Sequence, residues 1–231
     1  MGSDRDLKVA AARVALESVR SGMKVGLGTG TTAEELVKLL AAELESGRLS
    51  DIRCVCTSAR TEELARSLGI PVAALGELAP LDLAIDGADE IDPSLRLIKG
   101  RGGALLREKI VEQAAAHFIV IADETKLVER LGRGALPVEV IPLALEVLKG
   151  RFDGMGLRPE LRRAGGNPFM TDEGNRILDV SIPEGRDIAD VVAEIERWAG
   201  VVETGFFPRE AGEAVIASAE GVRRVVRNVP V

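Results

Sequence analysis

The sequence predicts an α/β protein built on a doubly wound parallel sheet, together with a second, smaller α+β unit. Up to residue 131, apolar strand-like segments alternate with longer helical segments, which is typical of a parallel sheet covered by helices. Hydrophobic residues make up 46% of the chain and aromatic residues only 3%, with no tyrosine. We therefore expect a core of Val, Leu, Ile and Ala, which suits helices packed on a parallel sheet.

The chain is predicted to begin with a helix, a strand, a glycine-rich loop and a second helix. Residues 6–21 have helical periodicity and many alanines, and Gly22 supplies a stop. The short apolar strand MKVGLGTG ends in glycines, and TTAEELVKLLAAELESG has the pattern of a helix. Residues 31–35 fit a capping box in either of two registers, so a threonine side chain is expected to cap this helix.

The alternation of strands and helices continues to residue 123. In order, the predicted elements are the strand IRCVCTS, the helix ARTEELARSLG, a short strand and turn in IPVAALGELAP, the strand LDLAIDGADEID, the helix GGALLREKIVEQAAA and the strand HFIVIAD. The strand LDLAIDGADEID breaks at Asp86-Gly87, so polar residues follow directly on an apolar run.

The pattern changes after residue 131. The segment GLRPELRRAGGNPFMTDEGNRILDVSI is predicted to form two strands around a polar turn region, followed by the helix DIADVVAEIERWAG and the strand VVETGFF. This order indicates a small α+β unit with an antiparallel sheet. The tail EAVIASAEGVRRVV is predicted to be a strand with a short helical end, and this strand is expected to return to the first sheet.

Charge and composition argue against several classes of protein. The net charge of −7 does not favour a nucleic-acid or anionic-membrane partner. The N-terminus lacks the apolar stretch of a signal peptide, and no apolar run approaches the roughly 18 residues of a membrane span. Cys54 and Cys56 form C-x-C without a second Cys or His cluster, which favours buried thiols over zinc. We expect a cytoplasmic protein.

The first candidate ligand loop is GLGTGTT, residues 26–32. It follows a strand and opens a helix, so its glycines and free amides suit a phosphate. A Walker A loop is excluded because no lysine follows these glycines. A dinucleotide fingerprint fails because Thr31 takes the place of the third glycine and the next strand ends in Thr57-Ser58 rather than an acid. A phosphate site and an ordinary strand–helix turn both remain open at this point.

The second loop, DGADEID at residues 86–92, is expected at the carboxyl end of a strand, where open α/β sheets bind ligands. Its four acids suggest a metal site, but Ala88 breaks the EF-hand pattern. A solvated acidic turn is the alternative. Asp86 comes straight off an apolar strand, so we expect it to be partly buried, with a shifted pKa.

The third segment, KGRGGALLREKIVEQ, places Lys99 and three glycines before a helix. If that helix starts near Gly103, Glu108 lies in its second turn, close to the ligand end. Apolar neighbours would raise the pKa of this carboxyl, as a general base requires. A solvated helix residue is the alternative for Glu108.

Nucleophilic triads are not expected in this chain. The only histidine, His117, opens a strand, and no serine lies in a G-x-S-x-G elbow. Base chemistry must therefore come from carboxylates or lysines. Lys8 and Lys126 are further candidates, with surface lysines as the alternative for each.

Together these segments resemble the type A ribose-5-phosphate isomerase family. The motifs that carry the resemblance are GLGTGTTA, the TS of CTSARTEEL, AIDGADEID, IKGRGGALLREKI, IADETK and LPVEVIP, in the order and approximate spacing of the family. The combination of DGADE with KG-x-GGA-x-x-x-EK is specific. Departures are small: Arg101 occupies a variable place in the glycine loop, and Cys56 stands where proline or another residue is common.

The resemblance implies interconversion of ribose 5-phosphate and ribulose 5-phosphate, in the non-oxidative pentose phosphate pathway, without a metal or organic cofactor. It implies Glu108 as the general base of an enediolate mechanism, Lys99 as a stabilising cation, and Asp86 or Asp89 as the group that shuttles the ring-opening proton. The substrate contacts that it implies are Lys8, Thr29, Gly30, Thr31, Thr32, Gly87, Ala88, Gly100, Arg101, Gly102 and Lys126.

The resemblance also implies a Rossmann-like catalytic domain of residues 1–131 plus 208–231. An inserted α+β (ferredoxin-like) domain of residues 132–207 and a homodimer or homotetramer are implied as well. Two alternatives use the same residues. One is a sugar-phosphate-sensing regulator domain, although the chain has no evident helix-turn-helix or basic patch. The other is an aldose–ketose isomerase for a different sugar phosphate.

Overall fold

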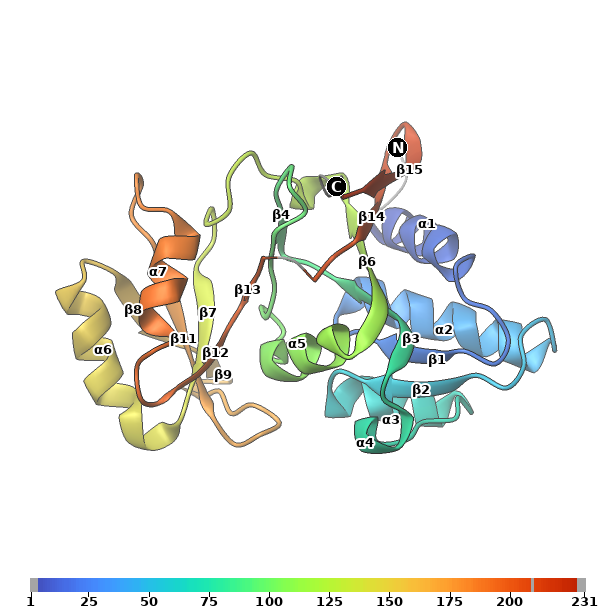
Figure 1. The fold of residues 1–231 in the computed structure, drawn as a ribbon, viewed down its shortest axis with the longest axis horizontal. Coiled ribbons are helices and arrows are strands. Elements are labelled where there is room, and N and C mark those ends of the chain that lie inside the picture. Colours follow the sequence, from blue (N-terminus) through green and yellow to red (C-terminus); the bar gives the residue numbers. More distant parts are fainter. Residues whose placement is uncertain (1–3, 209, 228–231) are drawn as a thin grey trace.

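A computed structural model describes residues 4–208 and 210–227, and shows two sheets of different size side by side (Figure 1). The larger has six strands in the order β15-β14-β6-β3-β1-β2. All neighbours pair in parallel except β14 and β15, which are antiparallel. The strands are β1 (Lys24–Leu27), β2 (Arg53–Cys56), β3 (Leu81–Gly87), β6 (Ala115–Asp123), β14 (Glu213–Ser218) and β15 (Gly221–Val226). The predicted α/β class with a Rossmann-like parallel sheet is confirmed.

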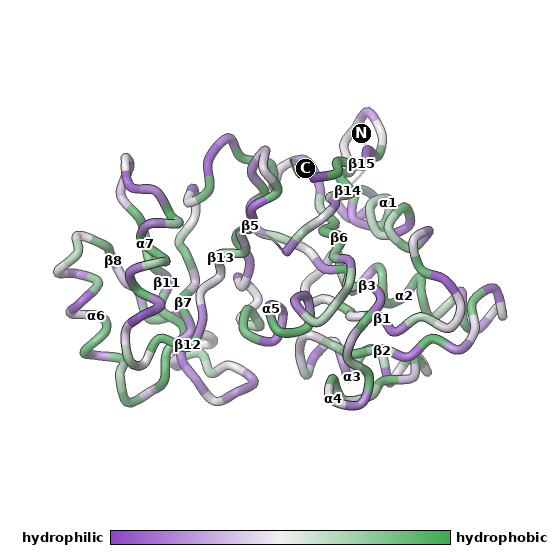
Figure 2. Tube along the Cα trace, viewed as in Figure 1, coloured by the Kyte–Doolittle hydropathy of each residue, from purple (hydrophilic) through white to green (hydrophobic). Residues whose placement is uncertain are grey.

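Helices cover both faces of this sheet. They are α1 (Asp4–Leu16), α2 (Thr31–Glu45), α3 (Ala59–Ser67), α4 (Leu75–Leu78), α5 (Leu105–Gln113) and the 3-10 turn η1 (Glu124–Lys126). Neighbouring residues of a strand face opposite ways: Cys54 of β2 packs with residues of α1, α2 and α3, whereas Val55 packs with Leu78 of α4 and Val111 of α5. The central strands β6 and β14 are hydrophobic stretches of the chain (Figure 2).

The smaller sheet has the strand order β12-β7-β11-β8, with antiparallel neighbours. Its elements are β7 (Leu136–Val140), η2 (Pro142–Ala144), α6 (Leu145–Gly154), β8 (Arg158–Leu161), β11 (Arg176–Ser181), α7 (Ile188–Ile195) and β12 (Val201–Thr204). The chain order β-α-β-β-α-β with this strand order is ferredoxin-like. Between β8 and β11 lies a small hairpin of β9 (Arg163–Ala164) and β10 (Asn167–Pro168).

A three-stranded sheet lies between the two larger ones (Figure 1). It has the order β13-β5-β4 and consists of β4 (Glu90–Ile91), β5 (Leu97–Ile98) and β13 (Phe206–Phe207). Lys99 follows β5, and its backbone N–H donates to the carbonyl of Gly205 at 2.9 Å. This small sheet therefore fixes the backbone of the lysine–glycine loop. The exact domain bounds expected from the sequence stay a prediction.

The chain tail is partly as predicted. β14 returns to pair in parallel with β6, as expected. The predicted helical end is wrong, because residues 221–226 form β15, paired with β14 over its whole length. Gly221, with φ of 132°, makes the tight turn that closes this hairpin. In the described parts of the chain, no helix is both long and apolar enough to cross a bilayer.

The helix α2 begins at Thr31 as predicted, but its cap differs from the expectation, and α5 begins later than expected. Gly30, with φ of 104°, is the N-cap of α2, and no side chain caps this helix, so the predicted capping box is wrong. The amides of its first turn are left open as a result. The helix α5 begins at Leu105 rather than near Gly103, because φ of 87° at Gly103 is not helical. Glu108 therefore lies in the first turn of α5, not the second.

Candidate active site

One pocket collects the three candidate loops at the carboxyl ends of the parallel strands. It is lined by residues that follow β1, β3, β5 and β6, together with residues of α1 and α5. Every predicted site residue except Asp86 lines it. The lining residues are Lys8, Thr29, Gly30, Thr31, Thr32, Gly87, Ala88, Asp89, Lys99, Gly100, Arg101, Gly102, Glu108 and Lys126.

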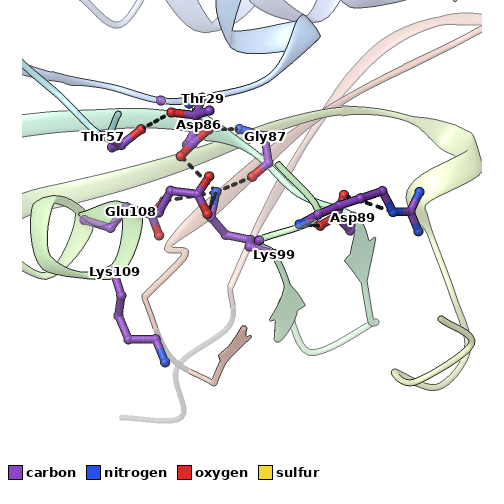
Figure 3. A network of polar contacts seen from close by, with 12 residues as sticks. Thr29, Thr57, Asp86, Gly87, Asp89, Lys99, Glu108 and Lys109 are labelled. Carbon is purple, nitrogen blue, oxygen red and sulfur yellow. Dashed lines mark hydrogen bonds and ion pairs between the residues drawn. The ribbon is translucent and has the colours of Figure 1, made fainter. Parts of the chain in front are cut away.

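Asp86 lies behind the pocket and is 1% exposed. Its Oδ1 accepts hydrogen bonds from the backbone N–H groups of Thr29 (2.9 Å) and Gly87 (2.6 Å), and its Oδ2 lies 2.9 Å from Nζ of Lys99 (Figure 3). These contacts tie the loop after β1 to the loop after β3. The first loop can approach only because residue 28 is glycine: a Cβ there would lie 2.1 Å from Cγ of Asp86.

Lys99 is the buried cation of the site. Its Nζ donates to the carbonyl of Gly87 at 2.5 Å and lies between the rings of Phe118 and Phe207, 5.8 and 5.6 Å from their centroids. Burial alone would lower the pKa of Lys99, but the three carboxyls of Asp86, Glu108 and Glu112 raise it above its ordinary value. The ammonium therefore stays charged over the whole working pH range.

Glu108 points from the first turn of α5 towards Lys99 (Figure 3), and its Oε2 lies 3.8 Å from Nζ. The residue is 4% exposed, so the solvated-helix alternative does not hold. Burial raises the pKa of Glu108 to about 8; Lys99 opposes this shift, and Asp86 and Asp89 add to it. A carboxyl that titrates near neutral pH and lines a pocket has the properties of a general base.

Glu112 was not predicted from the sequence. It lies one turn after Glu108 on the same face of α5, its side chain is 0% exposed, and its Oε1 lies 3.1 Å from Nζ of Lys99. Apart from this ammonium, neither carboxyl oxygen has a hydrogen-bond donor among residues 4–208 and 210–227. Burial raises the pKa of Glu112 well above its ordinary value, and Lys99 opposes that shift. The i,i+4 spacing from Glu108 is the one sequence signal that could have revealed it.

Lys109, the residue after Glu108, points away from the pocket (Figure 3). Its Nζ contacts Glu203 at 2.6 Å and donates to the carbonyls of Thr204 and Phe206, each at 2.9 Å. These contacts fix the segment that joins β12 to β13. Of the Glu-Lys pair of the motif, Glu108 therefore lines the pocket and Lys109 has a structural role.

The acidic loop divides in the same way. Asp89 faces the pocket, and its Oδ2 accepts a hydrogen bond from the N–H of Arg101 at 2.8 Å. Glu90 instead accepts from the amides of residues 132–134, and Asp92 pairs with Arg96 at 2.6 Å. In the part of the chain that the structure describes, no three His, Cys, Asp or Glu side chains gather as a metal site requires.

The lining of the pocket also carries positive charge and free amides. Thr31 and Thr32 open the 15-residue helix α2, whose N-terminus attracts anions. Lys8 is 17% exposed, and its Nζ lies 2.6 Å from Asp4. Lys126 makes no ion pair with any residue in the described ranges. These groups therefore suit the pocket to a phosphate.

Hydroxyl groups hold the loop after β1 in place. Oγ1 of Thr29 lies 2.7 Å from the hydroxyl of Thr57, donates to Ser58 at 2.8 Å and lies 3.2 Å from that of Thr61. Thr61 in turn donates to the carbonyl of Gly28 at 3.0 Å. The hydroxyl and the N–H of Thr29 are both engaged, so the amides and hydroxyls of Thr31 and Thr32 are left to contact a ligand.

Known proteins share this sequence and fold. The profile of the family described as Ribose 5-phosphate isomerase A (phosphoriboisomerase A) matches residues 53–221. A ribose-5-phosphate isomerase A from Sinorhizobium medicae is 50% identical over 228 residues, 95% of this chain and 96% of the relative. One from Roseiflexus sp. is 51% identical, over 92% of each chain.

Solved structures agree with the sequence relatives. A D-ribose-5-phosphate isomerase in complex with phospho-erythronic acid gives a TM-score of 0.94 at 40% identity, covering 98% of this chain and 100% of that chain. The ribose 5-phosphate isomerase from Plasmodium falciparum gives 0.92 at 37% identity, over 97% and 100% of the two chains. The chain therefore belongs to the ribose-5-phosphate isomerase A family, a family of aldose–ketose isomerases.

Proposed function

We propose that this protein interconverts D-ribose 5-phosphate and D-ribulose 5-phosphate through an enediolate, with Glu108 as the general base. The observation that carries the proposal is the Glu108 carboxyl, which lines the pocket beside a buried ammonium and has its pKa raised to about 8. At neutral pH such a group both accepts and returns a proton readily. Family membership supports the choice of substrate.

The phosphate binds at the N-terminus of α2, where Thr31 and Thr32 present free amides and Lys8 and Lys126 supply charge. Ribose 5-phosphate arrives as a closed ring. Asp89 takes the proton of the carbon 1 hydroxyl and returns a proton to the ring oxygen, which opens the ring to the aldehyde. Asp89 is chosen over Asp86 because it faces the pocket, whereas Asp86 is buried behind it.

Isomerisation moves one proton between neighbouring carbons. The Glu108 carboxylate removes the proton from carbon 2, and the electron pair forms a double bond to carbon 1 while the aldehyde oxygen becomes negative. Glu108 then returns the proton to carbon 1, as the proton of the carbon 2 hydroxyl passes to the carbon 1 oxygen and carbon 2 becomes the ketone. Lys99 and the amides of the glycine loop stabilise the oxyanion; one such donor is worth roughly 3–4 kcal/mol.

Phospho-erythronic acid offers a binding probe, because its carboxylate carries negative oxygens where the enediolate carries them. A related isomerase has been solved in complex with it. We propose that it occupies the same pocket here and competes with substrate. Ligands that resemble the intermediate bind tightly to such sites.

The test is turnover by the purified protein on a panel of pentose and hexose phosphates, followed by NMR in both directions. We expect conversion of ribose 5-phosphate, inhibition by phospho-erythronic acid, and no loss of rate after treatment with EDTA. Preferred turnover of another sugar phosphate would assign a different isomerase. Binding of the sugar phosphates without turnover would assign a sensor domain and contradict the proposal.

A homodimer or homotetramer belongs to the same proposal. Leu143 in η2 and Val147 in α6 are 91% and 63% exposed, which is unusual for large apolar side chains. Light scattering coupled to size exclusion gives the mass in solution. A monomer at working concentrations contradicts this part of the proposal.

A further inference from the structure

A single arginine of the smaller sheet reaches across to the glycine loop of the pocket. Arg162 directly follows β8 and is 13% exposed. Its Nη1 donates to the carbonyl oxygens of Gly100 at 2.6 Å and Arg101 at 3.1 Å. Its Nε and Nη2 donate to the two carboxyl oxygens of Asp179 on β11, the first at 2.9 Å. The guanidinium is thus clamped on one side and binds the loop on the other.

The two carbonyls that Arg162 binds belong to successive peptide groups. In a trans peptide, the C=O and the following N–H point in opposite directions. Holding both carbonyls on Arg162 therefore aims the N–H groups of Arg101 and Gly102 away from it, on the same side of the loop. Successive N–H groups arranged in this way form a small anion-binding concavity.

Both N–H groups face the site. The N–H of Arg101 donates to Oδ2 of Asp89 at 2.8 Å. The N–H of Gly102 has no acceptor within residues 4–208 and 210–227, and Gly102 lines the pocket. A Cβ at Gly102 would lie 3.8 Å from Cγ2 of Thr29, so this loop faces the loop after β1 across the pocket. An open donor at this place is available to a bound ligand.

We propose that Arg162, clamped by Asp179, is a positioning residue for the isomerase reaction. It sets the direction of the Arg101 N–H, which orients Asp89, and of the Gly102 N–H, which binds an oxygen of the reacting end of the substrate. This inference rests on the proposed function for the role of Asp89. The smaller sheet thereby takes part in catalysis without placing Arg162 in contact with substrate.

Arg163 provides a matched control. It carries the same charge at the next position, is exposed, and donates to the carbonyl of Gly166 within its own hairpin. Loss of a general electrostatic effect of this segment would affect variants at both positions alike. A change in the direction of the Arg101 and Gly102 N–H groups would affect variants at Arg162 alone.

The experiment compares Arg162→Met, Arg162→Lys and Arg163→Met in the full chain. The dissociation constant of phospho-erythronic acid is measured by calorimetry, kcat and KM are measured with ribose 5-phosphate, and circular dichroism reports the folded fraction. We expect Arg162→Met to bind the acid about tenfold or more weakly, because a charge-assisted hydrogen bond is lost. Its kcat should fall about 10- to 100-fold, as expected when a catalytic group is misplaced.

The dissociation constant and the kcat of Arg162→Lys should lie between those of Arg162→Met and the parent. An ammonium can bind one carbonyl but cannot pair with Asp179 at the same time. If Arg162→Met does not fold, Arg162→Lys alone decides. A folded Arg162 variant that binds the acid and turns over substrate like Arg163→Met overturns this inference and leaves the proposed function standing. A parent protein that does not isomerise ribose 5-phosphate overturns the proposed function instead.

Discussion

Oε1 of Glu112 lies 3.1 Å from Nζ of Lys99, in a cluster where three carboxyls surround one ammonium. Full ionisation would leave a net charge of about −2 in a buried site, which is strongly unfavourable. Protons must therefore reside on the cluster. Glu112 and Asp86 are both buried and do not line the pocket, but Asp86 accepts hydrogen bonds from two backbone N–H groups, whereas Lys99 is the one donor near the Glu112 oxygens among the described residues. We therefore expect Glu112 to hold a proton and to leave Glu108 to exchange protons with substrate.

The first prediction concerns Glu112→Gln and the pH dependence of stability. Because burial raises the pKa of Glu112, its proton is bound more tightly in the folded chain than in the unfolded chain. This contribution to stability is complete below the ordinary pKa of 4.5 and is lost as the pH rises through the raised pKa. We therefore expect the free energy of unfolding of Glu112→Gln, relative to that of the parent, to be higher at pH 8 than at pH 5.

Urea unfolding at the two pH values measures this difference. The matched control is Glu45→Gln, at an exposed position in the last turn of α2, where the difference should not change with pH. A Glu112→Gln variant whose relative stability is the same at pH 5 and pH 8 would mean that Glu112 is ionised in the folded protein.

The second prediction is that Glu108→Gln loses turnover but not binding. The amide has the shape of the carboxyl but cannot accept a proton, so kcat should fall by about 10²–10⁴-fold with little change in KM. Steady-state kinetics with ribose 5-phosphate give both constants. Glu112→Gln, one turn along the same helix, should keep kcat within about threefold, because it replaces a carboxyl that is already neutral. Near-parental kcat in Glu108→Gln would remove Glu108 from the mechanism.

The third prediction is the shape of the pH profile. Glu108 acts as a carboxylate, and its pKa is raised to about 8, so kcat/KM should rise with pH and level off above this value. Lys99 should cause no change in the profile below pH 10.5, because its pKa is raised above the ordinary value of 10.5. Rates measured from pH 5 to pH 9.5 locate the limb. A profile that is already level at pH 5 would show that Glu108 titrates like a solvated carboxyl.

The pocket could be predicted from the sequence because its residues come from short segments that follow strands. The carboxyl ends of parallel strands meet at one edge of the sheet, so the loop at Thr29, the loop at Asp86 and Lys126 had to converge once the strands were recognised. The glycines after Lys99 follow β5 of the antiparallel three-stranded sheet, so this argument does not place them. The roles of the two aspartates were not separable in this way. Only the packing shows that Asp86 is buried behind the pocket while Asp89 faces it.

Residues outside the loops could not be predicted. Glu112 has the pattern of an ordinary helix residue, and its environment depends on its burial beside Lys99, which comes from the loop after β5. Arg162 lies about 60 residues from the loop that it holds, in a different sheet, and no motif marks it. The predicted helical end of the tail was wrong because β15 pairs with β14 in a hairpin, and β14 is itself held by β6, a non-local contact that local propensity does not report.

The fourth prediction separates the two pocket lysines that we propose to bind the phosphate. Lys126 has no ion pair among the described residues, whereas Lys8 contacts Asp4 at 2.6 Å. Lys126→Ala should therefore raise KM for ribose 5-phosphate by about tenfold, the effect of losing one charge-assisted hydrogen bond. Lys8→Ala should raise KM by less. Lys149→Ala, on α6 and paired with Glu146, is the control and should leave KM unchanged. Equal effects of Lys8→Ala and Lys126→Ala would mean that the phosphate displaces Asp4 from Lys8.

The fifth prediction concerns Gly28, which allows the loop after β1 to reach Asp86. A Cβ at this position would lie 2.1 Å from Cγ and 2.5 Å from Cα of Asp86, so β3 or the loop must move. Gly28→Ala should lower the free energy of unfolding by at least about 1–3 kcal/mol, the usual range for overpacking. It should also lower kcat, because Asp86 holds both Lys99 and the N–H of Thr29.

Gly150→Ala is the matched control for Gly28→Ala. Gly150 lies within α6, and a Cβ there meets no atom within 4 Å. The same substitution should therefore stabilise the protein by up to about 1 kcal/mol through helix propensity and leave kcat unchanged. Thermal unfolding and steady-state kinetics on both variants separate the two effects. If Gly28→Ala has the unfolding temperature and the kcat of the parent, Asp86 can move without consequence. The contact of Asp86 with Lys99 would then not set the charge balance on which the proposed role of Glu108 depends.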